Sequence, residues 1–118
     1  MYTRREKIIK DIKLVTEYID SMDGFHDYRI GHIEAKKDQI SVIIESDART
    51  PHNKGAYTWF LKFKGTADFS VDFDTVCPFF IYETRIENSI FYMDCTNGGI
   101  SFSFKEMTIE TPTMAQRD

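Results

Sequence analysis

The chain has 118 residues, of which 42% are hydrophobic and 14% are aromatic, and its formal net charge is −4 at pH 7. This length is typical of a single domain, so we expect one domain over residues 1–118, with a core that needs no disulfide or metal. The acidic balance argues against nucleic acid and against an anionic membrane surface as partners, because both bind to basic faces.

The first predicted element is an amphipathic helix over residues 3–22. Thr3 and Glu6 have the spacing of a capping box at its start, and Gly24 is suited to the left-handed conformation that ends a helix. One apolar stripe follows helical periodicity and consists of Ile8, Ile12, Val15, Ile19 and Met22. A helix with one apolar face is expected to pack on a sheet.

Alternating apolar and polar residues predict about seven strands between residues 27 and 111. Gly31 permits a β-bulge in the first strand, which would return Ile30 and Ile33 to the same core. A change of apolar parity after Phe104 indicates a bulge or bend near Lys105-Glu106. The predicted strands are 28–35, 40–45, 57–64, 67–74, 79–87, 90–95 and 100–104.

The connections between these strands are mostly short. Asn97-Gly98 is a strong hairpin signal, because both residues accept positive φ. Residues 46–56 are the one long loop, and residues 112–118 are a polar tail. No segment of helical length separates two strands, so parallel βαβ units are not expected. The predicted fold class is therefore α+β, with the N-terminal helix packed on a mainly antiparallel sheet, a sandwich or a half-barrel.

The lack of a recognisable signal peptide and the small number of cysteines predict a cytoplasmic protein. The first residues lead into the amphipathic segment and not into the apolar core of a signal peptide. No apolar run approaches the ~20 residues that a membrane-spanning helix requires. The two cysteines, Cys77 and Cys95, are expected to be reduced, and no Cys/His spacing suits zinc. We therefore predict no metal, no cofactor and no membrane partner.

Polar groups that can do chemistry are densest around the segment from Gly24 to Ile30. His26 and His32 would come together if the chain folded back at Gly31, and such a set suits a small ligand or a transition metal. The structural alternative is that Asp27 caps the turn or accepts a local hydrogen bond, and we favour it for Asp27. The ligand-binding candidates are His26, Asp27, Arg29 and His32.

A second set of candidates lies on predicted strands. Asp68, Asp72 and Asp74 share one face of the predicted strand 67–74. They are either a solvated, edge-protecting face or a docking face for a basic partner. Phe60 lies on the polar face of its strand, which suggests that a second layer or a partner chain covers it. The partner-face candidates are Asp68, Asp72, Asp74 and Phe60.

No catalytic residues are predicted, because the motifs of known catalytic sites are missing. The sequence contains no GxSxG elbow, no P-loop, no GxGxxG and no HExxH. An adjacent His-Asp pair occurs in metal phosphohydrolases, but those enzymes are helical and need further ligands that this chain lacks. The protein is therefore expected to be non-enzymatic.

Two stretches carry a resemblance to a known group of proteins. The segment from Gly24 to Ile30, with the strand pattern of Asp38, Ile40, Val42 and Ile44, and the later segment from Gly99 to Phe104 supply the matching motifs. With them the chain resembles small, largely uncharacterised bacterial proteins, some of which are classed as immunity proteins of polymorphic-toxin systems. The resemblance implies an α+β fold and a non-enzymatic binding role, and it supplies no functional residues.

Three hypotheses for function follow. The leading hypothesis is an intracellular protein-binding module, with a toxin-immunity protein as its most concrete form and a toxin as its partner. The second is a small-ligand or metal-binding domain that uses the cluster around His26. The third is a structural homo-oligomer joined through an exposed sheet face or edge.

Overall fold

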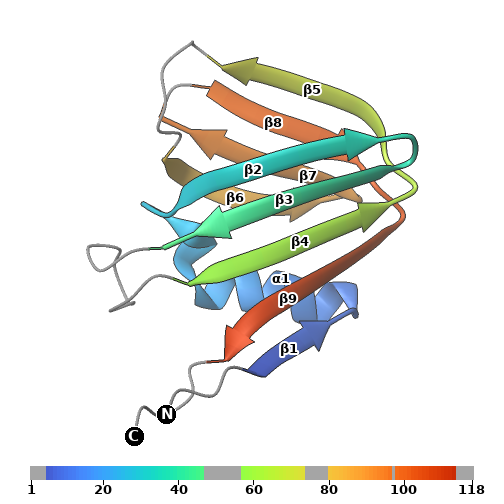
Figure 1. Ribbon diagram of the computed structural model, residues 1–118. Helices are drawn as coiled ribbons and strands as arrows, with labels where there is room; N and C mark the ends of the chain where they lie inside the picture. The colour runs from blue at the N-terminus through green and yellow to red at the C-terminus, as the bar shows by residue number, and fades with distance from the viewer. Residues whose placement is uncertain (1–4, 47–56, 74–79, 97, 114–118) are drawn as a thin grey trace, which may run out of the picture.

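A computed structural model describes residues 5–46, 57–73, 80–96 and 98–113 (Figure 1). Within these ranges nine strands form two sheets, and one α-helix, α1 (Ile12–Ser21), accompanies them. Every pair of neighbouring strands is antiparallel. The predicted α+β class and the antiparallel pairing are confirmed, although the alternating pattern predicted fewer strands.

Two chain crossings connect the sheets. The five-stranded sheet has the order β1 (Arg5–Ile9), β9 (Glu106–Thr113), β4 (Thr58–Lys64), β3 (Gln39–Glu45) and β2 (Arg29–Lys36). The four-stranded sheet has the order β5 (Ala67–Phe73), β8 (Gly98–Ser103), β7 (Ile90–Cys95) and β6 (Ile81–Glu87). The chain passes from β4 to β5 at Gly65 and from β8 to β9 at Lys105, and the Lys105 N–H donates to the Lys64 carbonyl at 2.9 Å. The predicted change of parity near Lys105 therefore marks the passage between sheets.

The predicted helix over residues 3–22 is wrong in its first half. Residues Arg5–Ile9 form β1, and the helix begins only at Ile12. The Asp11 side chain caps it, accepting hydrogen bonds from the backbone N–H groups of Lys13 (2.8 Å) and Leu14 (3.3 Å). Ile9 is buried opposite Ile109, whereas Ile8 is 53% exposed, which is the alternation of a strand. Thr3, half of the predicted capping box, lies outside the described residues.

The predicted polar tail over residues 112–118 also needs correction. Strand β9 continues through Pro112 to Thr113, and its last five residues, from Ile109 to Thr113, pair with the whole of β1. Thr111 is buried, so the strand still belongs to the core at this point. The pairing of β1 with the end of β9 is the main reason that the sheet is larger than predicted; residues 114–118 lie outside the described part.

The β2–β3 hairpin matches the prediction. The register between the two strands shifts between Ile30 and His32, which is the expected bulge at Gly31. Ile30 is buried and Ile33 packs partly against the core, as the bulge requires. Asp38 closes the hairpin with a positive φ of 61°. The long loop predicted over residues 46–56 falls almost wholly outside the described ranges.

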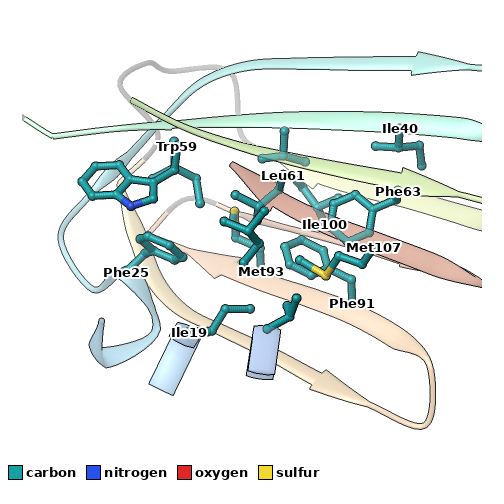
Figure 2. Close-up of a cluster of buried hydrophobic side chains, with 14 of the residues drawn as sticks. Ile19, Phe25, Ile40, Trp59, Leu61, Phe63, Phe91, Met93, Ile100 and Met107 are labelled. Carbon is teal, nitrogen blue, oxygen red and sulfur yellow. The ribbon is translucent and has the colours of Figure 1, made fainter. Parts of the chain in front are cut away.

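The core lies between the two sheets and is rich in aromatic rings (Figure 2). The Phe63 ring of β4 lies with its centroid 4.8 Å from that of Phe91 and 4.7 Å from that of Phe102, so it touches β7 and β8 across the interior. At the other end Trp59 packs edge-on against Phe25 and Tyr28. Side chains from both sheets thus interdigitate in one continuous core.

Helix α1 lies against β9 and β6 and covers the core on that side (Figure 1). Val15 and Ile19 are its buried residues, and the Trp59 Nε1–H donates a 2.7 Å hydrogen bond to Tyr18 Oη. Ile12, which the predicted stripe placed in the core, is 47% exposed. No helix within the described ranges is long and apolar enough to cross a membrane.

Candidate functional site

The structure divides the predicted ligand cluster between two places. His26 follows the short 3-10 turn Asp23–Phe25, and its Nδ1 lies 2.9 Å from the Tyr82 carbonyl oxygen, a distance at which a protonated Nδ1 donates a hydrogen bond. His26 Nε2 lies 3.5 Å from an Asp27 carboxylate oxygen. These two residues therefore stay together beside β6.

Arg29 and His32 lie elsewhere, on the outer face of the five-stranded sheet. Arg29 Nε is 3.2 Å from a Glu45 carboxylate oxygen on the neighbouring strand. His32 stands opposite Ile43, because the bulge at Gly31 shifts the register by one residue. The chain does not fold back to join His32 to His26, so the four predicted residues do not form one site.

His26 borders a surface hollow of about 440 Å³ between the end of α1 and β6. Three carboxylates line it, from Asp20, Asp23 and Glu83, and the Tyr82 ring stands edge-on to the His26 ring. This arrangement suits a cationic group. The described residues contain no group of three His, Cys, Asp or Glu side chains that could hold a metal ion.

Gly24 makes the hollow possible because it brings the turn against β6. Its φ is +63°, and a Cβ at this position would lie 3.2 Å from the Thr84 backbone nitrogen and 3.3 Å from the Thr84 carbonyl oxygen. Sequence reasoning found His26 but missed Glu83 and Tyr82, because these come from a strand almost sixty residues later. No local sequence pattern predicts that Tyr82 and Glu83 lie beside His26.

The partner-face candidates also separate, because Phe60 and the aspartates are on different sheets. Phe60 is half-buried on the outer face of β4, with Ile43 on one side and Glu110 on the other. Asp68 and Asp72 belong to β5 in the four-stranded sheet. Asp74 and the side chain of Asp72 lie outside the described part.

Strand β5 differs from the Phe60 site on β4 because β5 lies at the edge of its sheet. It is the last strand of its sheet and has a β-partner, β8, on one side only within the described residues. The register shifts after Ala67, and Asp68 has a positive φ of 56°, which marks a bulge. From Ser70 to Phe73 the pairing with β8 is regular, so this stretch presents a continuous edge with no strand beside it among the described residues.

The inner side of β5 is only partly covered. Val71 lies opposite the buried Ile100, and the Phe69 ring lies with its centroid 6.0 Å from that of Phe102, so both side chains point to the core side. Even so, Phe69 is 43% and Val71 is 45% exposed. In Figure 1 β5 diverges from β2 and forms the upper margin of the molecule, on the side away from α1. We call residues Asp68–Phe73 the β5 edge.

Comparison with known proteins yields no relative. The chain matches no family model, no curated protein and no solved structure. The class that the fold and the β5 edge define is therefore structural: an α+β protein of two antiparallel sheets with an open sheet edge.

Proposed function

We propose that the chain is a protein-binding module, and that its partner adds an extended segment to the β5 edge. The observation that carries the proposal is the partial exposure of Phe69 and Val71 on the core side of a strand that is paired on one edge only among the described residues. In this proposal the two sheets are a half-barrel that the partner's segment closes. Added strands of this kind gain affinity from main-chain hydrogen bonds and specificity from alternate side chains.

Burial of apolar surface favours such an addition. Covering the exposed parts of Phe69 and Val71 stabilises the complex by on the order of 2 kcal/mol. The main-chain hydrogen bonds of the added strand contribute further, because the free N–H and C=O groups of an edge strand are otherwise paired only with water. Together these terms support a specific complex.

The charge of the β5 edge selects the partner. Asp68 is exposed, and Asp72 belongs to the same strand. A basic segment complements these carboxylates, whereas a second copy of β5 paired antiparallel would bring like charges together. This favours a foreign basic partner over a homo-oligomer formed through this edge. The most concrete form is a toxin-immunity protein, which the resemblance of the segments Gly24–Ile30 and Gly99–Phe104 supports.

The test compares two charge insertions of matched exposure. Val71→Arg places a long cation on the β5 edge, and Leu14→Arg places the same side chain on an exposed position of α1. We expect the wild type and Leu14→Arg to retain the same partner from the source cell, and Val71→Arg to lose it. Adding that partner should also slow hydrogen exchange of the amides from Ser70 to Phe73. Equal retention by Val71→Arg, or no retained protein at either low or physiological salt, would contradict the proposal.

A second candidate function is binding of a small cation in the hollow beside His26. The observation that favours it is the convergence of the Asp20, Asp23 and Glu83 carboxylates beside an exposed Tyr82 ring. Thermal-shift measurements with spermidine test it: His26→Ala and Glu83→Gln should reduce the shift, and His32→Ala on the other sheet should not. Identical shifts in all variants would exclude this site.

A further inference from the structure

A second groove, of about 630 Å³, lies where the β1–α1 junction meets β4 and β9, and no residue of the β5 edge lines it. Its lining includes four lysines and two exposed isoleucines. We call it the lysine groove and define it by Ile8, Lys10, Ile12, Lys62, Lys64 and Lys105.

The fold itself gathers these lysines. The backbone hydrogen bond from Lys105 to Lys64 holds the two chain crossings together. Gly65 lies directly beneath the Lys105 side chain, since a Cβ there would approach the Lys105 Cβ and Cγ to 2.9 Å. Lys64 and Lys105 are thus held next to each other through their backbones at the point where the chain changes sheets, and both line the groove.

The groove keeps an excess of positive charge in a protein whose net charge is −4. Lys62 forms a salt bridge with Glu110, and Glu106 stands across the strand from Lys64. Lys10, Lys64 and Lys105 have no ion pair among the described residues. Four lysines against two glutamates leave an excess of two positive charges.

Apolar surface lies beside these charges. Ile8 is 53% and Ile12 is 47% exposed, and both line the groove. Nucleic-acid phosphates would use the lysines but would gain nothing from the two aliphatic side chains. An anionic membrane could use both, but it would also meet the Glu106 and Glu110 carboxylates that line the groove. A ligand that uses both features carries carboxylates and aliphatic groups close together.

We propose that the lysine groove binds an acidic segment of a protein partner in which glutamate or aspartate alternates with aliphatic residues. Charge complementarity steers the segment to the groove, and burial of Ile8 and Ile12 holds it there. The site is separate from the β5 edge and carries the opposite charge, so the inference does not depend on the proposed function. The molecule then has two docking surfaces, one for a basic strand and one for an acidic segment.

The experiment uses a fluorescent synthetic peptide of Glu and Leu residues, with a Lys-Leu peptide of the same length as the control. Fluorescence anisotropy should detect binding of the Glu-Leu peptide that weakens at high salt. The double variant Lys64→Glu/Lys105→Glu should bind the peptide at least about tenfold more weakly, because two attractions become repulsions. The matched control Lys36→Glu/Lys37→Glu, which changes two exposed lysines at the β2–β3 turn, should bind like the wild type.

Two further variants test the apolar part of the groove and its independence from the β5 edge. Ile12→Ser tests the apolar part of the groove without changing charge, and it should also weaken binding. Val71→Arg on the β5 edge should leave peptide binding unchanged, which separates this site from the other. Equal binding of the Lys-Leu peptide, no loss in Lys64→Glu/Lys105→Glu, or binding of an oligonucleotide or phosphatidylserine vesicles in place of the Glu-Leu peptide would overturn the inference.

Discussion

Cys95, the last residue of β7, illustrates how burial changes the chemistry of one side chain. It is half-buried, and this burial, with a smaller effect from the neighbouring Asp94 carboxylate, raises the pKa of its thiol from 9.0 to about 11. Burial likewise raises the pKa of Tyr18, against the opposing effect of its hydrogen bond from Trp59. Both groups are therefore held in their neutral forms at physiological pH.

The raised pKa of Cys95 predicts slow thiol chemistry and a loss of stability in alkali. Because the folded-state pKa is the higher one, the thiol's contribution to stability is complete below pH 9.0 and is lost as the pH rises through about 11. In a Cys77→Ser background, thiolate absorbance should titrate near pH 11 in the folded protein and about two units lower in urea. Alkylation at mildly alkaline pH should be about a hundredfold slower than in urea. Coincident titrations with and without urea would contradict this.

Among the elements, β1 is the one whose type was predicted wrongly, because the sequence pattern indicated a helix there. Its isoleucines continue the spacing of the α1 stripe, so helical periodicity accounts for them as well as a strand does. Ile8 and Ile9 decide between the two, because Ile9 is buried and Ile8 is half-exposed on opposite faces. Residues 5–9 form a strand because they pair with residues 109–113 at the other end of the chain. Local residue preferences contain no information about such a distant pairing.

A pair of alanine substitutions tests this assignment. Ile9→Ala should lower the free energy of unfolding by about 2–4 kcal/mol, because it leaves a cavity in the core beside Ile109. Ile8→Ala removes the same atoms from an exposed position and should cost less than about 1 kcal/mol. Urea denaturation of both variants measures the difference. Equal losses, or a larger loss for Ile8→Ala, would speak against the strand.

Elements with strong local signals were predicted well, whereas sites were not. The β2–β3 hairpin was predictable because Gly31 and the polar turn before Gln39 act within a few residues. The hollow beside His26 was not, because Glu83 reaches it from a distant strand. The exposure of Val71 was equally hidden: alternation identifies its face, but the position of the other sheet decides whether that face is covered.

At the scale of the whole molecule, Phe63 ties the two sheets together. Its ring contacts Phe91, Phe102 and Phe104 from the opposite sheet and the β8–β9 crossing, with centroids 4.7–5.4 Å away. Strand alternation places Phe63 on the same face of β4 as Leu61 and Trp59, and all three are buried. Which rings meet Phe63 depends on how the sheets are stacked, and the sequence does not encode that locally.

The central place of Phe63 predicts a strong effect on global stability. Phe63→Ala should cost about 3–5 kcal/mol and bring the protein close to unfolding. Phe60→Ala, three residues earlier on the outer face of β4, should cost much less, since Phe60 is only half-buried. Chemical denaturation followed by the Trp59 fluorescence compares them. A similar loss in both variants would mean that the outer face of β4 is as well packed as the core.

The pairing of β1 with β9 makes the chain almost cyclic. Arg5 stands across from Thr113, so both ends of the described chain leave the five-stranded sheet at one corner, remote from β5 (Figure 1). A short linker between the ends and a new opening at the Asn88-Ser89 turn would preserve every strand pairing. The starting point of the chain is thus interchangeable in this architecture, and a protein fused at either end projects from a corner of the five-stranded sheet and leaves the β5 edge unobstructed.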